Sequence, residues 1–402
     1  DTPGTYALTL CDAIGSPVAS KTTEVEPRAA AMTSTHVVVA SHSVVFLWRY
    51  RGGGGSDDET RTFHVDSDAR DGAFGDASSY GASNDPVTAV AASEKTLLVA
   101  RKSGAMTKFG LPGFISEGRL ATKCRARVLA LNCKGTKFAA IDASGTLSVF
   151  DVPPKSSENA AAKPVPVKAT FQKKDAWDVR WSDDDEHALA AMEKTKMVVY
   201  RGAEPEQPVV SSAHICAFRD LTVRAVALDE IMRAGSADSF KPRREHVFDR
   251  DTAALRDARR MLAEAADASE AFRFAERGGG HPRLWRLLAE HALERHDLTL
   301  ADKAFVRCSD YHGIQFVKRL KRLESETARR GEIAAYFAKF DDAERIFLEA
   351  DRADLAVELR KNVGDWFSVE KLVQNVPNAG DDDTLHAAWR HIGDYFADRR
   401  RW

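Results

Sequence analysis

The sequence has few cysteines, no long apolar run and almost no net charge. Its five cysteines are scattered over 402 residues and are odd in number, which is typical of free thiols in a reducing compartment. No run of about 18 apolar residues is present to form a membrane-spanning helix. Lysine and arginine number 58 against 60 acidic residues, a net charge of -2, so no general basic excess favours nucleic acid as a partner.

Both ends of the sequence lack features that would close a domain. The chain begins Asp1-Thr2-Pro3-Gly4, with no initiator methionine and no signal-peptide pattern. It ends in Arg399-Arg400-Arg401-Trp402, with no polar helix to cap the apolar stripe before it. We therefore expect a fragment, cut at both ends.

Signatures of catalytic sites are also missing. No GxSxG, HExxH, Walker or kinase motif occurs. Cys124 and Cys133 are nine residues apart, whereas zinc sites use closely spaced pairs. The histidines do not show metal-pair spacing, and we expect solvated or capping roles for His281, His291 and His296. His36 and His42 lie in or beside expected strands, six residues apart, with no acidic residue in register. The sequence predicts no catalytic residue, no cofactor, no metal and no enzyme activity.

The remaining candidates for chemistry also have simple structural interpretations. Two carboxylate runs, residues 183–186 (DDDE) and 381–383 (DDD), lack the spacing and glycine of a calcium loop, so we expect solvated turns. A glycine run at 52–55 has no Lys-Ser/Thr after it to bind phosphate. Most tryptophans lie on predicted core stripes and are expected to pack inside: Trp48, Trp177, Trp181, Trp285, Trp366 and Trp389.

The first 222 residues have the pattern of β-structure. Short apolar runs rich in valine, leucine and aromatics alternate with Gly/Ser/Asp turns every 8–12 residues. This spacing is typical of a sandwich, a barrel or a propeller. The clearest expected strands are residues 6–10, 37–40, 44–48, 87–91, 97–100, 128–131, 138–141, 147–150, 176–181 and 197–200.

A repeat favours the propeller. Residues 103–109 (SGAMTKF) align without a gap on 144–150 (SGTLSVF), at an offset of 41. Pro112 meets Pro153 at the same offset. A period near 40 with about four strands per unit is typical of WD40 blades, although chance similarity between hairpins is the alternative. We predict part of a WD40-type propeller, with four or five blades, over residues 1–222, and flexible insertions at about 51–86 and 153–168. Residues 62–65 are a further candidate strand.

From about residue 223 the apolar period becomes helical. Short helices are separated by polar breaks at 296–297, 340–342, 364–365 and 380–383. Residues 301–308 (ADKAFVRC) resemble 343–350 (AERIFLEA) at an offset of 42. Ala301 and Ala343 would allow close helix approach, with Phe305 and Phe347 filling the groove. We predict a tetratricopeptide-like α-solenoid of helical hairpins over residues 223–402.

Several segments resemble one family in particular, that of the WD-repeat core subunit of intraflagellar transport complex A. They extend over nearly the whole chain, except the two insertions: 10–18 (LCDAIGSPV), 175–181 (DAWDVRW), 191–197 (AMEKTKM), 228–232 (LDEIM), 281–290 (HPRLWRLLAE), 304–308 (AFVRC), 316–320 (FVKRL) and 392–399 (IGDYFADR). The family has two N-terminal propellers and a longer helical tail. The resemblance implies that this chain carries the later part of the second propeller and the start of the solenoid.

The resemblance also implies a non-enzymatic scaffold in retrograde transport along the ciliary axoneme, ciliary assembly and entry of membrane proteins into cilia. The implied partners are other complex A subunits, complex B in assembled trains, ciliary membrane-protein cargo, the dynein motor indirectly, and the membrane through peripheral contact, but no nucleic acid. The implied location is the cilium or flagellum, at the axoneme and basal body, with a cytoplasmic pool. Coat-like subunits of the secretory pathway share this architecture, so a vesicle-coat or tethering subunit is the alternative.

Overall fold

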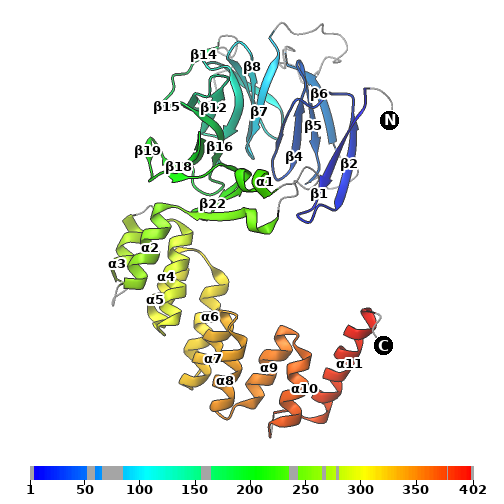
Figure 1. Ribbon diagram of the computed structural model, residues 1–402, viewed down its shortest axis with the longest axis vertical. Coiled ribbons are helices and arrows are strands. Elements are labelled where there is room, and N and C mark those ends of the chain that lie inside the picture. Colours follow the sequence, from blue (N-terminus) through cyan, green and yellow to red (C-terminus); the bar gives the residue numbers. More distant parts are fainter. Residues whose placement is uncertain are drawn as a thin grey trace. The chain divides into compact units, whose positions relative to one another are not determined.

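The computed structural model describes residues 4–51, 59–65, 85–154, 164–234, 243–264, 269–277, 280–377 and 379–399. The chain divides into two compact units, Asp1–Arg256 and Asp257–Trp402. We call them the sheet unit and the helical unit (Figure 1). None of the described helices combines the length and apolar character that a membrane crossing requires.

In the part of the chain that the structure describes, the sheet unit contains six sheets that follow one another in chain order. The first sheet pairs β1 (Tyr6–Cys11) with β2 (Pro17–Thr23). The second contains β3 (Ala29–Met32), β4 (His36–Ala40), β5 (Val44–Arg49) and β6 (Glu59–His64). The third contains β7 (Val87–Ala92), β8 (Thr96–Arg101), β9 (Ala105–Gly110) and β10 (Ile115–Ala121).

The later sheets continue the pattern of antiparallel neighbours. The fourth contains β11 (Ala126–Leu131), β12 (Lys137–Asp142), β13 (Leu147–Asp151) and β15 (Phe171–Lys173). The fifth contains β16 (Ala176–Trp181), β17 (Ala188–Glu193), β18 (Lys196–Arg201) and β19 (Glu204–Pro205), and β20 (Val209–Val210) also pairs with β18. The sixth contains β21 (Ala213–Arg219), β22 (Thr222–Ala227) and β23 (Val247–Asp251). Between β22 and β23 lie α1 (Leu228–Ala234) and the short 3-10 helix Arg244–His246.

Each sheet packs against the next through alternate side chains of its strands. In β8, Leu97 and Val99 join a core shared with the second sheet, whereas Leu98 and Ala100 join a core shared with the fourth. Successive side chains of a strand point to opposite faces, so a strand between two neighbouring sheets must be apolar on both. This explains why the central strands have continuous apolar runs in the sequence.

The two expected insertions contain ordered strands. Within 51–86, residues 59–64 form β6, which includes most of the candidate strand 62–65, and within 153–168, residues 165–166 form β14 (Val165–Pro166). β14 follows the fourth sheet's β13 in the chain, but it pairs in parallel with β10 and therefore extends the third sheet. The rest of the flexibility prediction falls on 52–58, 66–84 and 155–163, which lie outside the described residues.

The change from strands to helices occurs later than expected. The predicted boundary at 222/223 falls inside β22, which pairs with β21 on one side and β23 on the other. The compact units separate after Arg256 instead. The helix α1 lies between β22 and β23, so a helical pattern begins in the sequence before the last strand of the sheet unit.

The helices are short, and the connections that the structure describes in full, such as those from α4 through α10, are tight turns. They are α2 (Ala253–Glu264), α3 (Ser269–Arg277), α4 (Pro282–Glu294), α5 (Leu298–Arg307), α6 (Tyr311–Arg322), α7 (Glu326–Tyr336), α8 (Phe340–Glu349), α9 (Ala353–Val363), α10 (Trp366–Asn375) and α11 (Asp382–Asp398). Several begin at side-chain caps, such as Asp297 before α5 and Asp365 before α10. The break expected at 340–342 is the first turn of α8, because the chain reverses at Ala338, where φ is 57°.

Phenylalanine packs against glycine in two helix pairs. A Cβ atom added to Gly313 of α6 would lie 2.3 Å from the ring of Phe305 in α5. One added to Gly331 of α7 would lie 2.3 Å from the ring of Phe347 in α8. The expected roles of Phe305 and Phe347 are therefore confirmed, and the small residues opposite them are glycines that the sequence did not single out.

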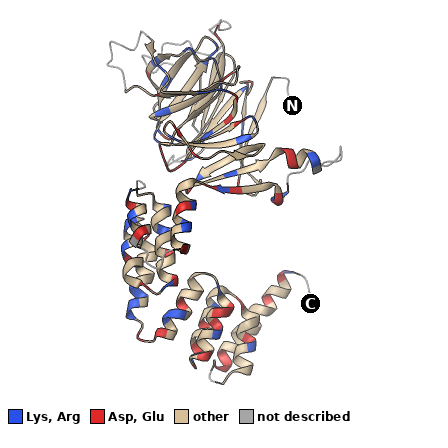
Figure 2. Ribbon diagram, turned by 60° about the vertical axis from the view of Figure 1, so that its left-hand side comes forward, with Lys and Arg blue, Asp and Glu red and all other residues tan. Residues whose placement is uncertain are grey.

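A buried arginine joins α8, α9 and α10. Arg360 of α9 is 8% exposed, and its guanidinium contacts Asp341 at 2.6 Å, Glu344 at 2.5 Å and Asp365 at 3.3 Å. Burial lowers the pKa of Arg360, but the contacts with Asp341 and Glu344 outweigh this effect and raise it above its usual range. Elsewhere, both basic and acidic residues are spread over the helices (Figure 2).

Candidate interaction surfaces

Three of the five cysteines lie in surroundings that disfavour the thiolate, the form a nucleophile needs. Burial, with a smaller contribution from Asp142, raises the pKa of Cys124 to about 11. Burial also raises the pKa of Cys133 and of Cys308. A nucleophilic cysteine requires a lowered pKa, so these three thiols stay protonated at neutral pH. Among the described residues, no group of three His, Cys, Asp or Glu could hold a metal ion.

The histidines have structural environments. His281 caps α4, because its Nδ1 accepts a hydrogen bond from the backbone of Arg283 at 3.1 Å. His36 is buried, and its Nδ1 lies 2.7 Å from the hydroxyl of Thr35. His291 is partly buried, and burial lowers its pKa and favours the neutral ring.

Two of the six expected core tryptophans are exposed. Trp177 lies at a bulge between Ala176 and Asp178, which turns its ring outward to 40% exposure, and its indole N–H donates to the Lys194 carbonyl. Trp389 is 46% exposed, and its indole N–H donates to Glu370. In both cases the ring edge has a polar partner outside the core.

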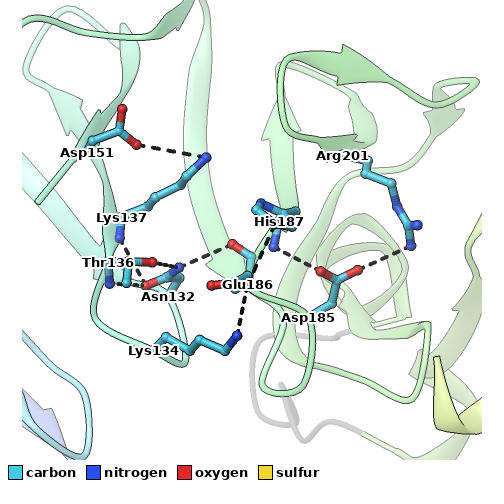
Figure 3. A network of polar contacts seen from close by, with 9 residues as sticks. All are labelled: Asn132, Lys134, Thr136, Lys137, Asp151, Asp185, Glu186, His187 and Arg201. Atoms are coloured by element: carbon cyan, nitrogen blue, oxygen red, sulfur yellow. Dashed lines mark hydrogen bonds and ion pairs between the residues drawn. The ribbon is translucent and has the colours of Figure 1, made fainter. Parts of the chain in front are cut away.

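The acidic run 183–186 joins neighbouring sheets (Figure 3). Glu186 lies in the turn after β16, and its carboxylate is 2.8 Å from the Nζ of Lys134 in the turn after β11. The backbone carbonyl of Glu186 also accepts a hydrogen bond from Asn132. Asp184 accepts from the backbone N–H of Asp220 in the sixth sheet. The expectation of a merely solvated turn is therefore wrong at these positions.

Asn132 is the centre of this contact. Asn132 is fully buried, and its Oδ1 accepts hydrogen bonds from the backbone N–H groups of Thr136 and Lys137. Its amide donates to the Thr136 hydroxyl and to the Glu186 carbonyl. One side chain thus shapes a turn of the fourth sheet and bonds that turn to the fifth. We call this end of the sheets the bonded end.

The opposite end of the same sheets has a basic groove of about 540 Å³. It is lined by Gln172 and Lys173 at the end of β15, by Lys174 and Asp175 in the turn after it, and by Glu193, Lys194, Thr195 and Lys196 from the β17–β18 hairpin. Four lysines face two carboxylates here. We call these eight residues the lysine groove.

The last two helices present aromatic side chains to solvent. Trp389, Tyr395 and Phe396 of α11 and Phe367 of α10 are each 39% to 46% exposed. Phe367 makes edge contacts with Tyr395 and Phe396. The sequence predicts an apolar stripe before the C-terminal arginines, and α11 carries it. Among the described residues of α11, Ala388 is the buried one.

Comparison with known families accounts for both units. The model described as the WDR35 second beta-propeller matches residues 1–250. The chain belongs to the WDR35 β-propeller family. The model described as the IFT80/172/WDR35/WDR19 TPR domain matches residues 284–375. The predicted order, a WD40-type propeller and then tetratricopeptide-like helices, is confirmed, as is the predicted family.

Individual relatives agree with the family models. WD repeat-containing protein 35 of Rattus norvegicus is 38% identical over 99% of this chain, which spans 35% of that protein. The protein of the same name from Homo sapiens is 39% identical over 99% of this chain, which spans 34% of it. The chain thus spans about a third of the length of the curated relatives it matches.

Proposed function

We propose that this chain is part of a structural scaffold subunit of intraflagellar transport complex A. The observation that carries the proposal is the order of the two family matches, a WDR35 propeller followed by a TPR domain shared by IFT-type proteins. The geometry supports assembly: neighbouring repeats are tightly joined, and the surfaces left over are a charged groove and an aromatic helix face.

The proposed role is support of retrograde transport along the axoneme, ciliary assembly and entry of membrane-protein cargo. The proposed partners are other complex A subunits and, in assembled trains, complex B, cargo, the membrane and, indirectly, dynein. The proposed location is the cilium or flagellum, at the axoneme and basal body, with a cytoplasmic pool. Binding of partners needs no catalytic group, so we propose that the protein is not an enzyme.

Affinity purification from ciliated cells tests this proposal. A tagged full-length protein containing these 402 residues is expected to co-purify with complex A subunits and to lie along cilia. A matched variant, Gly331→Ala, is designed to distort the helical unit and should reduce recovery of the subunits bound there. Co-purification with vesicle-coat subunits, and a Golgi location, would instead support the secretory alternative and contradict the ciliary scaffold.

A further inference from the structure

The lysine groove has more positive charge than its own residues neutralise. Asp175 is 3.2 Å from the Nζ of Lys194, and the Glu193 carboxylate accepts a hydrogen bond from the Tyr200 hydroxyl. Lys173, Lys174 and Lys196 form no ion pair with any residue that the structure describes. Both carboxylates are thus engaged, whereas three ammonium groups are available to a ligand.

The two ends of these sheets differ in how their charges are used. At the bonded end, Glu186 pairs with Lys134, and Asp185 pairs with Arg201 at 3.2 Å. At the groove end, the corresponding turns of the third sheet also contain lysines. Lys102 lies in the β8–β9 turn, and Lys123 lies in the turn after β10. Clustered charge of one sign raises the local concentration of ligands of the other sign.

The backbone beneath the groove is held in place. The N–H of Lys194 donates to the Asp175 carbonyl at 3.0 Å, which joins the hairpin to the segment before β16. The indole of Trp177 donates to the Lys194 carbonyl at 3.0 Å, and Ser211 donates to the Thr195 carbonyl at 2.8 Å. A ligand would therefore meet a preformed surface, which lowers the entropy cost of binding.

Two residues of the groove, Gln172 and Lys173, belong to an edge strand, β15. β15 pairs with β13 on one side, and no described strand pairs with its other side. Phe171 of β15 packs on Tyr200 of the fifth sheet, with ring centroids 4.8 Å apart, so this edge is anchored next to the hairpin lysines. An exposed edge bonds an added strand through its main chain, while flanking side chains select the sequence.

We propose that the lysine groove binds an extended, acidic segment of a partner protein. The segment adds a strand to the outer edge of β15, and its carboxylates lie between Lys173 and Lys174 on one side and Lys196 on the other. The groove volume of about 540 Å³ is suited to several residues of a peptide and is much larger than one inorganic anion requires. The inference concerns binding by the purified chain, so its test does not depend on the proposed complex.

The test measures binding of a short fluorescein-labelled peptide of alternating glutamate and threonine by fluorescence anisotropy. The double variant Lys173→Gln/Lys196→Gln is expected to raise Kd about tenfold, because it removes two unpaired cations. The double variant Lys173→Arg/Lys196→Arg keeps the charge and should bind like the unmodified chain. Circular dichroism checks that each variant is folded.

The matched control changes the same charge at the same end of the sheets but outside the groove. Lys102→Gln/Lys123→Gln is expected to change Kd by less than about twofold, since only the long-range field is reduced. An equal loss in both double variants would show non-specific attraction and overturn the groove as a site. A peptide of alternating glutamine and threonine that bound as tightly would overturn the requirement for acid.

Two further probes test the form of the ligand. Methylation of alternate backbone nitrogens of the peptide should weaken binding at least as much as the lysine changes, and an unchanged Kd would overturn strand addition. Vesicles of phosphatidylcholine with phosphatidylserine provide the other comparison. If these vesicles bind in a lysine-dependent way while the acidic peptide does not, the groove contacts lipid and the proposal is wrong.

Discussion

The sheet unit and the helical unit join neighbouring repeats by different means. In the sheet unit, wide apolar cores lie between sheets, and polar turns such as that of Asn132 add bonds from one sheet to the next. In the helical unit, two pairs approach closely where a phenylalanine ring lies against a glycine. The helical unit should therefore be sensitive to a methyl group added between paired helices, and the sheet unit to the loss of a hydrogen bond that joins two sheets.

The largest effect is expected for Gly331→Ala. The new methyl group would lie 2.3 Å from the buried ring of Phe347, so the helices must separate or the ring must move, at a cost of about 3 kcal/mol. Denaturant unfolding followed by far-UV circular dichroism measures the change in free energy of unfolding.

The control for this prediction is Gly393→Ala in α11, where an added Cβ meets no atom within 4 Å. Alanine is favoured over glycine in a helix, so this change should stabilise by about 1 kcal/mol. If both alanine variants shift stability in the same direction, close approach does not explain Gly331. The double variant Gly331→Ala/Phe347→Leu should recover part of the loss, since leucine leaves room for the methyl group.

A smaller effect, about 2 kcal/mol, is expected for Arg360→Met. The change leaves Glu344 and Asp365 without their shared cation, although the high exposure of Asp341 limits the penalty. Arg352→Ala is the matched comparison, because Arg352 forms a two-bond contact with Asp354 at the surface. We expect that change to cost less than about 1 kcal/mol in the same unfolding experiment. Equal costs for the two arginines would contradict a joining role for Arg360.

In the sheet unit, Asn132→Ala is expected to cost about 1.5 kcal/mol. It leaves the backbone N–H groups of Thr136 and Lys137 without their acceptor in a partly buried turn. Hydrogen exchange should then show faster exchange in the turn of Glu186 as well, because the bond between the sheets is lost. Lys134→Gln removes only the surface ion pair and should leave exchange nearly unchanged. Faster exchange confined to the fourth sheet would show that Asn132 shapes its own turn only.

The smallest effect concerns pH. Hydrogen bonds from the backbone of Leu300 and the hydroxyl of Thr299 lower the pKa of the capping residue Asp297. A carboxyl whose pKa is lower in the folded state adds stability above its unfolded pKa, about 4, and loses it as the pH falls through the folded value.

Asp297→Asn should keep the cap but remove this dependence, so the two chains differ by less than about 1 kcal/mol and converge in acid. Unfolding measured from neutral pH down to about pH 3 checks the slope around the unfolded pKa. A variant with the same acid sensitivity as the unmodified chain would show that Asp297 contributes none of it.

The repeated features of the fold were predictable from the sequence because they are local. The segments aligned at an offset of 41 place Gly104 and Gly145 in the corresponding turns after β8 and β12, with φ of 90° and 80°. Alternate burial then follows from the strand period. The helical repeat likewise placed Phe305 and Phe347 correctly, because their apolar stripes are visible within one helix.

The partners of these residues were not predictable, because they do not repeat. Gly313 follows Phe305 in the next helix, whereas Gly331 precedes Phe347 in the helix before it, so no offset aligns the two glycines. Glu186 and Lys134 meet across two sheets, and neither has a local pattern that names the other. The lysine groove combines the end of one sheet with the hairpin of the next, so its charge is dispersed along the chain.

The glycine beneath each phenylalanine also limits how the solenoid deforms. If α5 slid along α6 by one helical turn, about 5.4 Å, the ring of Phe305 would meet a side-chain-bearing position such as Val317 in place of Gly313. The same mismatch, with Ala335 in place of Gly331, opposes sliding of α8 along α7. Within these two pairs the register is therefore fixed, and any bending that keeps both contacts leaves α5 in step with α6 and α8 in step with α7.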